Sequence, residues 1–211
     1  MTPVFLHINS SGGRYLRKKF CEKYDNVFYV HHINPLLFVA DGIDKDKIIR
    51  FWRFRDVTKI NKGETTLKIS NTISVLDLDV KDKAYFTTLR NPVDRYLSEL
   101  SRGGGIDLSD NILSHNIMVK SLLVALTGDV SHYLRETDEE SYNKVIEGLK
   151  GMTIMIMDEG DESYKTLNEK YEFNTPVDFS KYKRKEIEEI MAERIREINQ
   201  WDIKLYNHYK E

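Results

Sequence analysis

Short apolar runs alternate with amphipathic segments in the first part of the chain. The run "VFLHI" (Val4 to Ile8) is rich in β-prone residues and ends at small polar ones, which predicts a buried parallel strand. A helix is expected next, because Leu16, Phe20 and Tyr24 recur at spacings of four and so share one face. A second strand is predicted from 26 to 33, within "NVFYVHHI".

The same alternation returns in the second part of the chain. The run "AYFTTL" (Ala84 to Leu89) predicts a strand, and the segment after it predicts a helix with Asn91 as N-cap and Pro92 as first helical residue. Three further elements are expected: a helix over 111–128, a strand over 152–157 and an amphipathic helix over 183–209 that bends near Trp201.

The stretch from Asp41 to Asp82 is charged and less regular. Its apolar residues suggest helical rhythm around Ile48 to Trp52 and strand character over 67–78. Neither pattern is strong enough to fix a boundary.

Strands that alternate with helices favour β-α-β units, which form a parallel sheet. At 211 residues and 40% hydrophobic content, the chain suits one compact domain. We therefore predict a single α/β domain over 1–211, with a central parallel sheet flanked by helices on both faces.

Charge and cysteine content narrow the function classes. Lys and Arg number 32 against 34 Asp and Glu, so the formal net charge is −2 and the chain lacks the basic balance typical of duplex nucleic-acid binders. The single cysteine, Cys21, excludes an internal disulfide and a multi-cysteine zinc site, and its place in an apolar rhythm favours a buried thiol. No apolar run approaches the ~18 residues of a membrane span. A cytoplasmic protein without metal is expected.

The first candidate site is the turn that follows the first strand. Asn9 to Gly13 are small residues whose backbone N–H groups can curl around an anion at a helix N-terminus, with hydroxyls from two serines as further donors. Arg14 and Arg17 could close over that anion. A plain tight turn before a solvated basic helix remains the alternative. The loop is not a nucleoside-triphosphate P-loop, because the spacing and lysine of that motif are missing.

The second candidate site lies where the strand ending at Leu89 passes into a helix. Arg90, Pro92, Arg95 and Ser98 form the run R-x-P-x-x-R-x-x-S. Carboxyl ends of parallel strands are where such folds bind ligands, so both runs are expected at one edge of the sheet. Surface ion pairs are the alternative for the two arginines.

Together, "FLHINSSGG" and "YFTTLRNPVDRYLSEL" resemble the two cofactor-binding segments of sulfotransferases that use 3′-phosphoadenosine 5′-phosphosulfate. The branch they resemble is the carbohydrate one, related to heparan-sulfate 2-O- and 6-O-sulfotransferases. "NIMVKSLLVALTG", "MDEGDESYKTL" and "INQWDIKLYNHYKE" are similar to later segments of the family in the same order. The resemblance therefore extends over nearly the whole chain.

This resemblance implies a P-loop-like three-layer sandwich and transfer of a sulfuryl group from that donor to a hydroxyl acceptor, either a small molecule or a glycan. It implies that Arg90 and Ser98 hold the 3′-phosphate. The residues that would surround the 5′-phosphosulfate are Asn9, Ser10, Ser11, Gly12, Gly13, Arg14 and Tyr15. Glycan-modifying members of the family often follow a membrane anchor in a secretory compartment. Since no anchor-like apolar run is found in this sequence, a bacterial or viral setting is expected here.

Two departures from the family pattern concern catalysis. The lysine of the first family segment falls on Ser10, and the family's base histidine falls near Ser70. His32, after the second strand, is our candidate base, and Arg14 is the candidate cation in place of the lysine. A catalytically impaired sulfotransferase-like protein that binds a nucleotide or an anionic partner remains the alternative. A kinase-like phosphoryl transferase is disfavoured by the missing P-loop lysine.

The acceptor pocket is assigned to the stretch over 35–80. Trp52, Arg53, Phe54 and Arg55 suit a sugar-like or acidic ligand, and a helix that packs its Trp and Phe into the core is the alternative.

Overall fold

The fold is described by a computed structural model. The residues it describes are 2–23, 27–31, 54–61, 64–65, 69–70, 74, 76, 82–100, 115–159, 165, 168–172 and 187–211. The helical rhythm suggested around Ile48 to Trp52 lies outside them.

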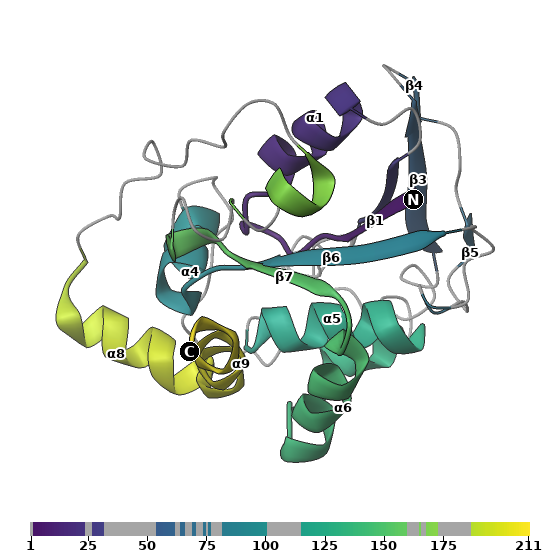
Figure 1. The fold of residues 1–211 in the computed structure, drawn as a ribbon. Helices are drawn as coiled ribbons and strands as arrows, with labels where there is room; N and C mark the ends of the chain where they lie inside the picture. Colours follow the sequence, from purple (N-terminus) through teal and green to yellow (C-terminus); the bar gives the residue numbers. More distant parts are fainter. Residues whose placement is uncertain are drawn as a thin grey trace.

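The first strand lies between two parallel neighbours in the sheet. β1 (Thr2–Leu6) pairs in parallel with β2 (Val27–His31) on one side and with β6 (Lys83–Leu89) on the other. β7 (Thr153–Ile156) continues the parallel set beside β6. The order β2-β1-β6-β7 brings the carboxyl ends of β1 and β6, each followed by a predicted ligand segment, to neighbouring positions (Figure 1).

The central parallel strands are as expected, and antiparallel strands that were not predicted extend the sheet beyond β2. β3 (Phe54–Asn61) pairs antiparallel with β2 and is extended by β4 (Glu64–Thr65) and β5 (Ile69–Ser70). β3 was not predicted, because its apolar residues, Phe54, Val57 and Ile60, recur every three positions and form neither a continuous apolar run nor a strict alternation. Phe54 and Arg55, two proposed acceptor contacts, start this strand.

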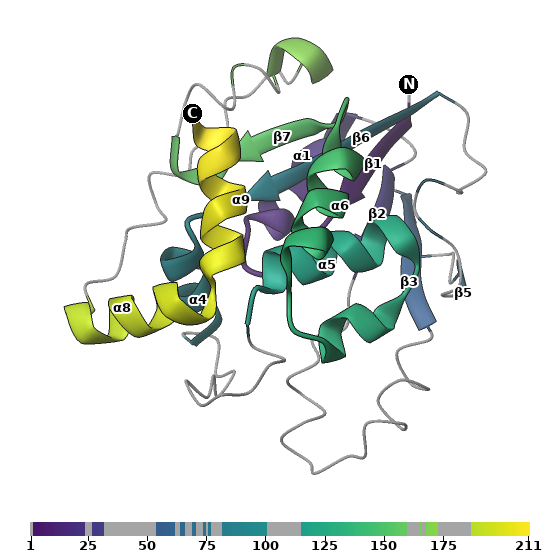
Figure 2. The same cartoon turned by 90° about the horizontal axis from the view of Figure 1, so that it is seen from below.

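Helices lie on both sides of the parallel strands. α1 (Gly13–Lys23) lies on one side, whereas α5 (Ile117–Thr127), α6 (Glu139–Leu149) and α9 (Gln200–Lys210) lie on the other (Figures 1 and 2). The remaining helical elements are α4 (Pro92–Leu100), α8 (Glu189–Ile198), and the short 3-10 helices η3 (Val130–Leu134) and η4 (Met157–Glu159). α6 was not predicted, although Tyr142, Val145 and Leu149 mark its buried face.

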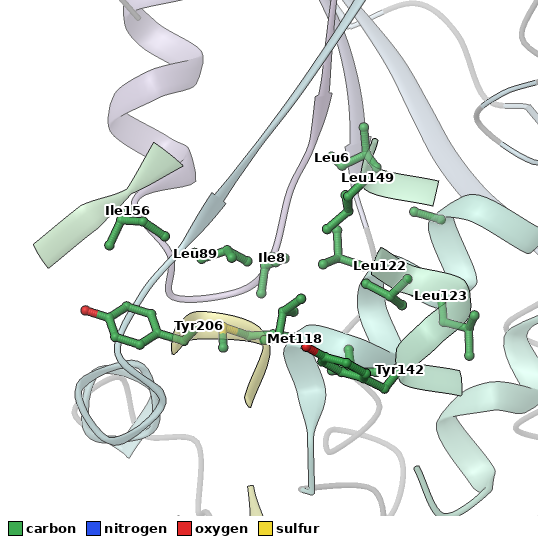
Figure 3. Close-up of a cluster of buried hydrophobic side chains, with 14 of the residues drawn as sticks. Leu6, Ile8, Leu89, Met118, Leu122, Leu123, Tyr142, Leu149, Ile156 and Tyr206 are labelled. Carbon is green, nitrogen blue, oxygen red and sulfur yellow. The ribbon is translucent and has the colours of Figure 1, made fainter. Parts of the chain in front are cut away.

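Side-chain alternation along β1 builds a different core on each face of the sheet. Val4 and Leu6, with Ile8 just beyond the strand, join the cluster against α5, α6 and α9 (Figure 3). The other residues of that cluster are Leu89, Met118, Val119, Leu122, Leu123, Ala125, Tyr142, Val145, Leu149, Ile156, Leu205 and Tyr206. Burial of this apolar surface is the main force that holds the helices to the sheet.

The opposite face carries an aromatic core. Phe5 stacks on Phe86 with ring centroids 4.6 Å apart, and Phe20 from α1 stacks on the same ring at 4.1 Å. Tyr171 packs edge-on against Phe20 at 5.0 Å. These contacts anchor α1, and with it the loop that precedes α1, to the sheet.

The predicted long C-terminal helix is two helices, broken at Asn199 between α8 and α9. The bend expected near Trp201 is thus confirmed as a break. At the break, the side chain of Asn116, the N-cap of α5, accepts hydrogen bonds from the backbone N–H groups of Trp201 (2.9 Å) and Asp202 (3.3 Å). The carboxylate of Asp202 in turn accepts from the N–H groups of Met118 and Val119, each at 2.9 Å.

The helices α5 and α9 are therefore each capped by a side chain from the start of the other. Asn116 adopts a left-handed backbone conformation with φ 50°. Its own N–H donates to the Asn199 side chain at 3.0 Å. These contacts satisfy five N–H groups at the two helix starts, which would otherwise lack partners.

Candidate functional site

The loop between β1 and α1 is tightly turned and buried. Ser10 and Gly12 both have left-handed backbones, with φ 63° and 76°, and Ser10 and Ser11 are 2% and 0% exposed. The N–H of Ser11 donates to the carbonyl of Ile8 at 3.3 Å, and the first bond of α1 runs from Leu16 N–H to the Gly12 carbonyl at 3.3 Å. The N–H groups before Leu16 therefore precede the helical ladder at the positive end of the helix.

Two side chains at the end of β6 hold this loop. Arg90 donates from Nη1 to the carbonyl of Ser10 at 3.1 Å, and Thr88 donates from Oγ1 to the carbonyl of Ser11 at 2.5 Å. Arg90 is only 7% exposed, which favours a fixed position for its guanidinium. The two motif segments that the sequence singled out, 80 residues apart, are thus in direct contact.

The hydroxyls of the two loop serines have different environments. The Ser10 hydroxyl donates to a carboxylate oxygen of Glu99, a residue of α4. The Ser11 hydroxyl is buried and, among the described residues, has no hydrogen-bond partner. Burying a hydroxyl without a hydrogen-bond partner costs free energy. A polar ligand in the loop could accept a hydrogen bond from the Ser11 hydroxyl and remove that cost.

Gly13 allows a close approach between the start of α1 and His7. A Cβ at Gly13 would lie 1.9 Å from Cδ2 and 2.2 Å from Nε2 of His7, well inside van der Waals contact. The His7 ring also lies against Phe5, with centroids 5.6 Å apart. The His7 ring therefore packs against the start of α1, and only a glycine at position 13 leaves room for it.

The junction after β6 is capped as predicted. The side chain of Asn91 accepts from the N–H groups of Val93 (3.0 Å) and Asp94 (3.4 Å). This confirms Asn91 as N-cap and Pro92 as the first residue of α4. The N–H of Asn91 itself donates to Asp158, from η4 after β7, at 2.6 Å. The carboxyl ends of β1, β6 and β7 are thereby joined by hydrogen bonds.

The two arginines of the second motif have different partners. Arg90 contacts the loop, whereas Arg95 is 3% exposed and interacts electrostatically with the fully buried Asp202. Burial raises the pKa of Asp202, opposed by Arg95, by two backbone N–H donors and by Lys120. Burial also lowers the pKa of Lys120 to about 8, against the attraction of Asp202 and Glu136. Arg95 therefore belongs to a buried charge cluster inside the helical layer.

The other predicted site residues are described to differing extents. Asn9 lies in the loop, and Ser98 lies on α4 one residue before Glu99, half-buried. Arg14 and Tyr15 occupy the first turn of α1, but their side chains lie outside the described part of the structure. His32, the candidate base, also lies outside it.

Sequence reasoning missed three residues at this site. Thr88 could have been found from strand alternation, since it shares a face of β6 with the buried Phe86. Glu99 and Asp158 gave no signal, because their importance comes from contacts with Ser10 and Asn91, 89 and 67 residues away.

Within the described ranges, no three His, Cys, Asp or Glu side chains gather closely enough to hold a metal ion. None of the helices found there is long and apolar enough to span a membrane. No protein-family model matches the chain, and neither does any curated protein sequence.

Proposed function

We propose that the protein is a sulfotransferase that uses 3′-phosphoadenosine 5′-phosphosulfate, built as a single P-loop-like domain with a three-layer sandwich. The observation that carries the proposal is the hydrogen bond from Arg90 to the Ser10 carbonyl. It joins two segments that resemble the family's 5′- and 3′-phosphate motifs. Two anion-binding segments in contact suit a nucleotide with an anionic group at each end.

The loop would receive the 5′ end of the donor. Its donors are the N–H groups at the start of α1, reinforced by the helix dipole, and the buried Ser11 hydroxyl. Arg90 and Ser98 would hold the 3′-phosphate. Sulfuryl transfer spreads negative charge over equatorial and leaving oxygens, as phosphoryl transfer does, so fixed donors and cations stabilise its transition state.

The remaining catalytic roles fall to His32 and Arg14. His32 is the proposed base for a hydroxyl of a small molecule or glycan, and Arg14 the proposed cation beside the leaving oxygen. Arg14 is next to the loop in sequence, because it directly follows Gly13. His32 directly follows β2, the strand that pairs with β1.

Calorimetric titration with the nucleotide product, 3′-phosphoadenosine 5′-phosphate, tests the proposal. We expect one site with micromolar or tighter affinity, lost in Arg90→Ala and kept in Arg196→Ala. Arg196 is a suitable control because it is an exposed α8 residue paired with Glu189 at 2.6 Å. Absence of binding at millimolar nucleotide would contradict the proposal.

A second candidate is a related protein that binds the nucleotide without turnover. Ser10 stands where the family has its lysine, and its hydroxyl is engaged by Glu99. A screen for labelled sulfate transfer to sugars and phenols separates the two candidates, since any transfer excludes the inactive one.

A further inference from the structure

The contact between Glu99 and Ser10 places a negative charge beside a loop that otherwise favours anions. Ser10 is 2% exposed and Glu99 is half-buried, so water screens this hydrogen bond only in part. A hydroxyl has a single hydrogen. While Ser10 donates to Glu99, it offers only lone pairs to a ligand in the loop, and lone pairs repel an anion.

From this contact we infer that Glu99 is a specificity-determining residue that keeps single small anions out of the loop. The inference rests on the proposed function. A loop at a helix N-terminus binds free phosphate or sulfate readily. A carboxylate bonded to its hydroxyl acts as an internal anion, and a ligand must displace it to reach the same donor.

The neighbours of Glu99 explain how a nucleotide could succeed where a lone anion fails. Ser98, the proposed 3′-phosphate ligand, precedes Glu99 on α4, and Arg90 is bonded to the Ser10 carbonyl. A 3′-phosphate held by Arg90 and Ser98 would repel the adjacent carboxylate of Glu99. Ser10 would then be released to donate to the 5′ group. The protein would thus select ligands with two anionic ends.

The experiment compares three probes by calorimetry: inorganic phosphate, adenosine 5′-phosphate and 3′-phosphoadenosine 5′-phosphate. The variant is Glu99→Gln, which removes the charge and keeps the shape. The matched control is Glu197→Gln, an exposed α8 carboxylate paired with Arg194 at 2.9 Å. A charge-assisted hydrogen bond corresponds to about tenfold or more in affinity. Glu99→Gln should strengthen the binding of phosphate and of adenosine 5′-phosphate by that factor. It should strengthen the binding of the bis-phosphate nucleotide by less.

The outcomes separate this inference from the proposed function. The inference alone is wrong if the wild type binds the bis-phosphate nucleotide but Glu99→Gln changes the preference by less than twofold. The preference here is the ratio of the affinity for that nucleotide to the affinity for phosphate. If no variant binds that nucleotide, both are wrong. If Glu99→Gln does not fold, Glu99→Asp replaces it, because the shorter side chain withdraws the carboxylate from Ser10. Glu99→Asp should then lower the preference at least threefold, and an unchanged preference overturns the inference.

Discussion

The guanidinium of Arg90 donates a 3.1 Å hydrogen bond to the backbone carbonyl of Ser10. This contact fixes the left-handed Ser10 in the loop and places a buried cation next to it. Arg90→Lys should therefore be a severe change, although it keeps the charge, because a lysine cannot present donors in a planar fork. We expect the affinity for 3′-phosphoadenosine 5′-phosphate to fall at least tenfold, measured by calorimetry. Equal affinity in Arg90→Lys would show that only charge matters at this position.

Ser10→Lys tests whether the neutral residue at the family's lysine position limits turnover. A lysine there would add a positive charge beside the leaving oxygen, and contacts of that kind contribute about 2.7–4 kcal/mol to transition-state stabilisation. We expect faster transfer of labelled sulfate. Ser10→Gly is the control for the positive φ of 63°. Unchanged turnover in Ser10→Lys would indicate that another cation, such as Arg14, already fills this role.

Gly13→Ala tests the close approach between His7 and α1. The new Cβ would overlap the His7 ring, so we expect a loss of about 1–3 kcal/mol in the free energy of unfolding, measured with urea. His7→Ala should relieve the overlap, so the double variant should be more stable than the sum of the single effects predicts. Gly151→Ala is a useful comparison, because that site has φ 78° and open space around it. Strict additivity of the His7 and Gly13 changes would contradict the contact.

Asn116→Ala tests the exchanged caps of α5 and α9. It leaves the N–H groups of Trp201 and Asp202 without their acceptor and places a Cβ residue without a polar side chain at φ 50°. A loss of about 2–4 kcal/mol in unfolding free energy is expected. Asn116→Gly should be less destabilising by about 1 kcal/mol, because glycine tolerates the left-handed backbone. If both variants are as stable as the wild type, the cap exchange contributes nothing.

The lowered pKa of Lys120 implies that the stability of the protein depends on pH. Its pKa is lowered to about 8 in the folded protein by burial, so above that pH the folded chain releases a proton that the unfolded chain keeps. Since the unfolded state then binds more protons, stability should rise with pH from about 8 toward 9.5, by about 2 kcal/mol. Lys120→Met should remove this rise in urea titrations. Buried Tyr142 and half-buried Tyr209 have pKa values raised by desolvation and act in the opposite direction, but only above about pH 10.

The sequence by itself determined the elements whose signals are local. The apolar run ending at Leu89 and the Asn91 cap depend on nearest neighbours and helix ends, and the structure confirms both. The loop of small residues was likewise visible, because only a few residue types suit left-handed turns.

Only the tertiary structure decided which polar groups meet. Glu99 reaches Ser10, Arg95 faces Asp202, and Asn116 caps α9 across distances of more than 80 residues in sequence. The antiparallel β3 was also fixed by its pairing with β2 rather than by its own composition. The physical reason is common to these cases: a hydrogen bond or ion pair depends on three-dimensional proximity, and the alternation of apolar residues encodes which face is buried, not which polar partner lies there.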